Sequence, residues 1–206
     1  MEKRIAQIIS YIFHPLLIPT YSLLIVFNAN AYFSFVLPIK AKVLLLIMMV
    51  VSTVLIPVFI FSIFRYKKII ASFQMKTKQE RMYPYLSTTI IYYLTYTLFT
   101  NTKIPAIYSF YLLIATVLSI VLLFINLRWK ICIHTAAMGG MTALFIGLYY
   151  QLGLNLLPII ILLIVCSGFV GFARLKLNSH KPSEVYVGWF VGALIFSTMS
   201  LLLYHQ

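Results

Sequence analysis

The chain has 206 residues, of which 63% are hydrophobic and only 9% are charged, and its mean hydropathy is +1.01. Ordinary soluble domains carry about a quarter charged residues, so this composition excludes a soluble globular protein. The formal net charge is +13, and the only acidic residues are Glu2, Glu80 and Glu184. We therefore expect an integral membrane protein with a single domain over residues 1–206.

Apolar segments follow one another along the whole chain. A helix needs about 20 apolar residues to cross roughly 30 Å of hydrocarbon, and an open sheet would leave peptide groups unpaired in lipid. The sequence therefore predicts an all-α fold, a polytopic membrane bundle of six to seven transmembrane helices. The expected spans, with the shorter and less certain one last, are 5–28, 41–64, 105–127, 133–150, 155–173, 184–204 and 86–100.

The first apolar segment, 5–28, is interrupted by His14, Pro15 and Pro19. Because proline removes a backbone donor and its ring clashes with the preceding turn, we expect a kinked or partly interfacial helix. The segment follows a basic start but is longer than the apolar core of a signal peptide, so we expect no cleavage. For His14 two interpretations are open: it lines a cavity between helices, or it is a buried histidine bonded to a neighbouring helix.

The cations are concentrated in the links between spans, which argues against a nucleic-acid-binding protein. If all seven segments cross, three cations lie on one side: Lys40, Lys42 and Lys103. The other thirteen are Lys3, Arg4, Arg65, Lys67, Lys68, Lys76, Lys78, Arg81, Arg128, Lys130, Arg174, Lys176 and Lys181. Since short cytoplasmic loops are rich in Lys and Arg, the count places these thirteen in the cytoplasm.

Three links on that basic side carry residues suited to polar chemistry. They cover Lys76 to Pro84, Lys130 to His134, and Arg174 to Glu184. An even number of predicted spans separates each link from the next. Side chains from all three links are therefore expected to meet at one membrane surface.

The last link resembles a signature of the type-2 phosphatidic acid phosphatase superfamily. The members of this superfamily are metal-independent phosphatases with a histidine nucleophile. Its pattern Ser-Arg-x5-His-x3-Asp is matched by Arg174, His180 and Glu184, with Glu in place of Asp and Ala173 in place of Ser. This is the specific part of the resemblance, which covers about residues 76–192.

The other two signatures of that superfamily are matched only in part. Pro-Ser-Gly-His is matched at His134 alone, because Ile131, Cys132 and Ile133 occupy the first three positions. In Lys-x6-Arg-Pro, Arg81 and a displaced Pro84 remain, but Gln74 stands at the lysine position. Lys76 or Lys78 is then an imperfect substitute for that lysine.

The resemblance implies a role for each matched residue. His180 would attack phosphorus while Glu184 fixes its tautomer, and His134 would act as general acid and base. Phosphate binding would fall to Arg81, Arg174, Lys78, Lys76 and Lys130. Structural interpretations remain open: a hydrogen-bonded helix cap for the Arg174–Glu184 link, a helix-start histidine for His134, a topological charge for Arg81, and headgroup contacts for the lysines.

No metal site and no cofactor are expected. Enzymes that hold Mg²⁺ over a phosphate rely on clusters of oxygen ligands, usually carboxylates, and this chain has only three carboxylate side chains, far apart in sequence. Two isolated cysteines and four scattered histidines do not have the spacing of a zinc site either.

The sequence thus predicts a lipid phosphatase that acts on phosphatidic acid, phosphatidylglycerophosphate or a polyprenyl pyrophosphate. A phosphotransferase fits the same residues. The alternative is a catalytically impaired homologue that serves as a lipid-headgroup binder or membrane assembly subunit, since Ile133 replaces a glycine at which backbone approaches phosphate closely. Expected partners are a lipid phosphate and membrane lipids, with no nucleic acid.

Small residues flank the predicted site and are expected to mark close helix contacts. They are Gly139, Gly140, Gly147, Gly168, Gly171, Gly188 and Gly192. Such faces also allow a homodimer. The expected location is the cell (inner) membrane. The side that the site faces stays open, because the cation count places these links inside whereas the resemblance implies the outside.

Overall fold

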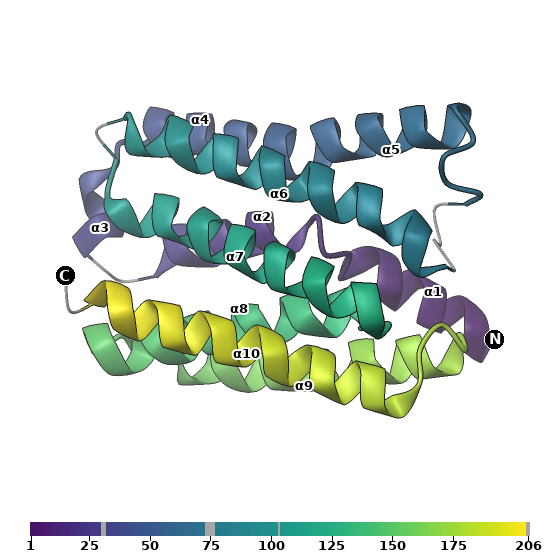
Figure 1. Ribbon diagram of the computed structural model, residues 1–206. Helices are drawn as coiled ribbons and strands as arrows, with labels where there is room; N and C mark the ends of the chain where they lie inside the picture. Colours follow the sequence, from purple (N-terminus) through teal and green to yellow (C-terminus); the bar gives the residue numbers. More distant parts are fainter. Residues whose placement is uncertain (30–31, 73–76, 103, 205–206) are drawn as a thin grey trace. The chain divides into compact units, whose positions relative to one another are not determined.

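The computed structural model describes residues 1–29, 32–72, 77–102 and 104–204, and within these ranges it contains helices but no strand (Figure 1). The all-α prediction is therefore confirmed. The helices are α1 (Glu2–Ile12), α2 (Ile18–Asn28), α3 (Tyr32–Val36), α4 (Ile39–Val50), the π-helical turn η1 (Val51–Leu55), α5 (Ile56–Tyr66), α6 (Lys78–Thr100), α7 (Ala106–Arg128), α8 (Ile133–Leu152), α9 (Leu157–Lys176) and α10 (Pro182–Tyr204).

Four helical segments in the described ranges are long and apolar enough to cross a membrane, as expected for an integral membrane protein. They are Ile39–Tyr66, Ala106–Arg128, Leu157–Lys176 and Pro182–Leu202. The first of these combines α4, η1 and α5. A bundle of six to seven crossings remains a prediction for the other segments.

The first apolar segment forms two helices, α1 and α2, of 11 residues each. The predicted interruption at His14 and Pro15 is therefore confirmed, while a crossing of the membrane by the whole of 5–28 stays a prediction. At 1.5 Å per residue an 11-residue helix is about 16 Å long, which is short of the roughly 30 Å of hydrocarbon. His14 lies in the break between the two helices.

Helix α6 is longer than the predicted segment 86–100, because it begins at Lys78. A capping box starts it early: the Glu80 N–H donates to Thr77 Oγ1, and the Thr77 N–H donates to the Glu80 carboxylate, each at 3.3 Å. Such reciprocal bonds satisfy donors that a helix start leaves unpaired. Arg81 therefore lies in the first turn of α6 and not in a link.

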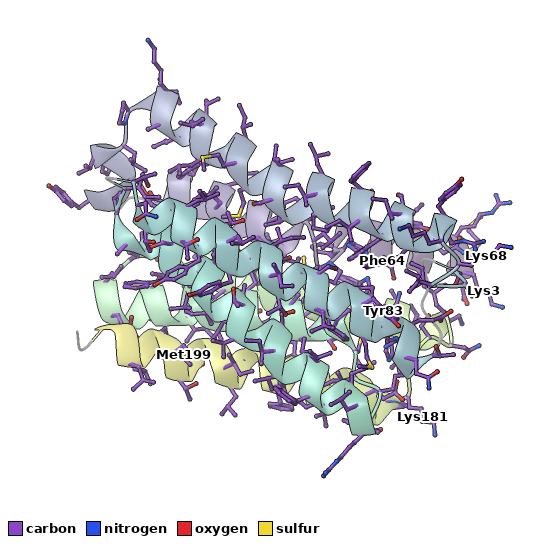
Figure 2. The ribbon with its side chains drawn as sticks, turned by 45° about the horizontal axis from the view of Figure 1, so that its top comes forward. Lys3, Phe64, Lys68, Tyr83, Lys181 and Met199 are labelled. Carbon is purple, nitrogen blue, oxygen red and sulfur yellow. The ribbon has the colours of Figure 1, made fainter. Side chains whose placement is uncertain are left out.

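The residues group into two compact units, one of residues 1–18 and 131–206 (unit 1) and one of residues 19–130 (unit 2). A single domain over the whole chain stays a prediction. In unit 2, α6 packs along α7, where Thr89 Oγ1 donates to Ser119 Oγ at 2.8 Å. The Phe64 and Tyr83 rings connect α5 to α6 with their centroids 5.9 Å apart (Figure 2).

In unit 1, α8 and α10 run parallel with their backbones in close contact. The Cys132 N–H donates to the Glu184 carbonyl at 3.2 Å near the two helix starts. A Cβ added at Gly192 would strike the carbonyl of Ala136, and one at Gly139 would strike that of Trp189. The predicted glycine contacts are thus confirmed along this pair, whereas Gly168 was wrongly included, because a Cβ there meets nothing within 4 Å.

Helix α1 packs against α9 in the same unit. The carboxylate of Glu2 pairs with Lys176 Nζ at 2.6 Å, and Ala6 and Ser10 are buried. Figure 2 shows Lys3 and Lys181 at one end of unit 1 and Met199 toward the other. The start of α1, the end of α9 and the start of α10 therefore share one end of the unit.

Candidate active site

A buried histidine–carboxylate pair lies at the start of α10. His180 Nδ1 and Glu184 Oε2 are 2.6 Å apart, and the two side chains are 1% and 7% exposed. Pro182 opens the helix, a position that tolerates proline because its missing N–H has no partner in the first turn. Glu184 follows in that turn, where the helix dipole favours a carboxylate.

The pair fixes how protons are distributed on the imidazole. An ionised carboxylate only accepts hydrogen bonds, so Nδ1 of His180 carries the proton that is donated to Glu184. In the neutral ring Nε2 then bears the lone pair. This is the tautomer that a nucleophilic histidine requires, and the carboxylate also stabilises the cation that forms when Nε2 reacts.

His134 stands beside this pair, in the first turn of α8. The Thr135 hydroxyl donates to the Val185 carbonyl at 2.8 Å, which, with the bond from Cys132, ties the starts of α8 and α10 together. His134 is buried, and its Nδ1 has no hydrogen-bond partner among the described residues. Such a buried nitrogen loses its bond to water without replacement, as expected for a group that binds a ligand.

Arg174 provides the positive charge of the cluster from the last turn of α9. It is half-buried, and its guanidinium lies close enough to interact electrostatically with the rings of His134 and His14. His180 acts on His134 in the same way. The structure thus brings together four residues that the sequence singled out: Arg174, His180, Glu184 and His134.

His14 belongs to the same cluster, although sequence reasoning did not place it among the site residues. Its ring meets that of His134 edge to face, with centroids 5.4 Å apart and planes at 83°. Burial, and secondarily the charge of Arg174, lower the pKa of His14 to about 4. The ring is therefore neutral at pH 7. The available signal was a histidine directly before Pro15 in an interrupted apolar segment.

The remaining predicted residues belong to unit 2, and their meeting with the histidines stays a prediction. Arg81 is buried in the first turn of α6, and Lys130 is half-buried after α7. Lys78 begins α6, and only its backbone is described. Lys76 lies outside the described residues.

Comparison of the chain with family models, with curated proteins and with solved structures gave no match. The resemblance to the phosphatidic acid phosphatases therefore stays a prediction from the motif residues alone. Among the residues that the structure describes, no three His, Cys, Asp or Glu side chains form a group that could hold a metal ion. The cluster instead offers a lone pair on His180, a second imidazole at His134 and a guanidinium at Arg174.

Proposed function

We propose that the protein is a membrane-embedded lipid phosphatase that hydrolyses a phosphate monoester or a pyrophosphate of a lipid through a phosphohistidine. The observation that supports this most is the buried His180–Glu184 pair at 2.6 Å, with His134 and Arg174 beside it. A carboxylate, a second imidazole and a guanidinium around one histidine are the parts that a two-step phosphoryl transfer needs.

In the first step the Nε2 lone pair of His180 attacks phosphorus. The P–N bond forms as the bond from phosphorus to the leaving-group oxygen breaks, and His134, which takes up a proton when the anionic phosphoryl group binds beside it, gives that proton to the departing alkoxide or phosphate oxygen. Glu184 accepts from Nδ1 throughout and offsets the charge that develops on the His180 ring.

In the second step neutral His134 takes a proton from water, and the resulting hydroxide attacks phosphorus. The P–N bond breaks, inorganic phosphate leaves and His180 regains its lone pair. General acid–base assistance of this kind typically contributes about 10²–10⁴-fold. A phosphotransferase follows if an alcohol takes the place of water.

Charge on the phosphoryl oxygens is balanced first by Arg174, whose planar guanidinium suits paired donation. The same end of unit 1 carries Lys3 and Lys181 (Figure 2), and the Lys176–Glu2 pair lies there too. A basic surface at the ends of apolar helices attracts anionic lipid headgroups. The contribution of Arg81 and of a lysine from Lys76, Lys78 and Lys130 to phosphate binding stays the prediction made from the sequence.

This placement favours an amphiphilic substrate. Arg174 ends the apolar segment Leu157–Lys176 and Glu184 lies near the start of Pro182–Leu202, so the cluster sits where a lipid tail in the bilayer can be continuous with a headgroup at the residues. Phosphatidic acid, phosphatidylglycerophosphate and polyprenyl pyrophosphate share this shape. We therefore propose a substrate with the features that these lipids share, an apolar chain and a terminal phosphate.

The test is phosphate release by detergent-purified protein from a panel of these lipids in excess chelator. We expect release from the wild type, its loss in His180→Ala, and unchanged release in Ser183→Ala, an exposed neighbour used as the control. If wild-type protein retains lipid phosphates but releases nothing from any panel member, a headgroup binder replaces the phosphatase. The absence of catalysis would then be explained by Ile133, which occupies the glycine position of the resembled signature.

A further inference from the structure

We propose that His14 is a third imidazole of the site and that its Nε2–H donates a hydrogen bond to an oxygen of the bound phosphoryl group. The inference rests on the proposed function and adds a residue that the mechanism above does not use. It makes the break between α1 and α2 a part of the substrate site.

The packing of α1 explains how His14 reaches the cluster. The Glu2–Lys176 pair and the buried Ala6 and Ser10 hold α1 against α9. The backbone carbonyl of Ser10 lies within interaction distance of the His134 ring. The helix ends at Ile12, and the turn that follows places His14 next to the same ring.

The local backbone determines which nitrogen of His14 carries the proton. The Leu16 N–H donates to His14 Nδ1 at 3.3 Å, so Nδ1 is the acceptor. In a neutral imidazole the other nitrogen then carries the hydrogen. His14 is therefore a neutral donor through Nε2, on the side of the ring away from the bond to Leu16.

The surroundings of His14 are suited to an anion. Arg174 places a positive charge near it, and His134 Nδ1 is buried without a hydrogen-bond partner among the described residues. The one carboxylate of the cluster, on Glu184, already accepts from His180. A phosphoryl group supplies the acceptor oxygens and the negative charge that such a set of groups requires.

Two substitutions separate this role from a structural one. His14→Asn keeps an acceptor where Nδ1 accepts from Leu16 but removes the donor at the Nε2 position. His14→Gln places an amide N–H near the Nε2 position and gives up the local bond to Leu16. Leu17→Met, a half-buried neighbour in the same break, is the matched control.

The experiment measures turnover of the best lipid phosphate together with inhibition by orthovanadate, which mimics a phosphoryl group in transfer. We expect His14→Asn to remain folded, as judged by its melting temperature, and to weaken both kcat/KM and orthovanadate binding by about tenfold or more. His14→Gln should retain most of both, and Leu17→Met should match the wild type. Wild-type values in His14→Asn with losses in His14→Gln would overturn the proposal, because His14 would then only hold the turn.

Orthovanadate also separates the two proposals from each other. Normal turnover in His14→Asn, with turnover lost in His180→Ala, overturns the role of His14 and leaves the phosphatase standing. If the wild type neither turns over any lipid nor binds orthovanadate, measured as a shift in melting temperature, the phosphoryl site itself is absent and both proposals fail.

Discussion

Units 1 and 2 hold their most extensively packed helix pairs together in different ways. In unit 1, α8 and α10 meet backbone to backbone through Gly139 and Gly192. In unit 2, α6 and α7 meet through side chains, with the hydroxyls of Thr89 and Ser119 at 2.8 Å. Glycine contacts leave two helices little freedom to slide along each other, so they fix the relative positions of the two helix starts. The pair with glycine contacts, α8 and α10 (Figure 1), carries His134 and Glu184, and His180 lies two residues before α10.

The largest effect is expected from a side chain at the glycine contact. In Gly192→Val the new Cβ would strike the carbonyl of Ala136, so α8 and α10 must separate. We expect little folded protein, measured as the monodisperse fraction in size-exclusion chromatography. Gly168→Ala is the control, because a Cβ there meets nothing within 4 Å. Equal losses from the two changes would contradict the comparison.

The next effect concerns the acceptor that orients His180. Glu184→Gln replaces an oxygen that accepts at 2.6 Å by a group without charge, so the reactive tautomer is no longer enforced. We expect phosphate release to fall by about 100-fold or more, by analogy with the loss of the carboxylate in other oriented histidine pairs. Folded yield should change little, and activity within a few-fold of the wild type would contradict the assignment.

Acidification should weaken unit 1 through His14, because the pKa of this ring is lowered to about 4 by burial and by Arg174. An exposed histidine takes up its proton near pH 6.5, so between about pH 6.5 and 4 the unfolded chain binds more protons than the folded one. Stability therefore falls as the pH drops through this window. In His14→Gln the melting temperature should fall less on acidification than in the wild type. An equal fall in the two proteins would contradict this prediction.

The smallest effect is expected in unit 2. Thr89→Val removes the hydroxyl that donates to Ser119, and hydrogen bonds between membrane helices contribute on average about 0.6 kcal/mol. We expect a slight decrease in melting temperature and unchanged phosphate release, measured in the same preparation. A loss as large as that of Glu184→Gln would mean that this hydroxyl pair belongs to the chemistry.

The sequence predicted the parts of the site that depend on local spacing. His180 and Glu184 stand four residues apart around the start of a helix, so their contact requires only that the helix begin near Pro182. The early start of α6 could have been found in the same way, because Thr77 and Glu80 form a recognisable capping box.

The position of His14 could not be predicted by spacing. It depends on α1 packing against α9, on the Glu2–Lys176 pair and on the break that turns the chain toward His134. These contacts join residues that are more than a hundred positions apart in the sequence. Neither periodicity nor spacing indicates against which other helix a short amphipathic helix will pack. The prolines did predict an interruption of 5–28, but not where the residues on either side of it pack.

The central claim is that His180 carries the phosphoryl group, and trapping it tests that claim most directly. Chelator-treated wild-type protein would be mixed with ³²P-labelled lipid phosphate and quenched rapidly, with His180→Gln and Ser183→Ala in parallel. We predict label that is stable to alkali, labile to acid and located on residue 180 by mass spectrometry, present in Ser183→Ala and absent from His180→Gln. Phosphate release without label on residue 180, or label that persists in His180→Gln, would contradict the account.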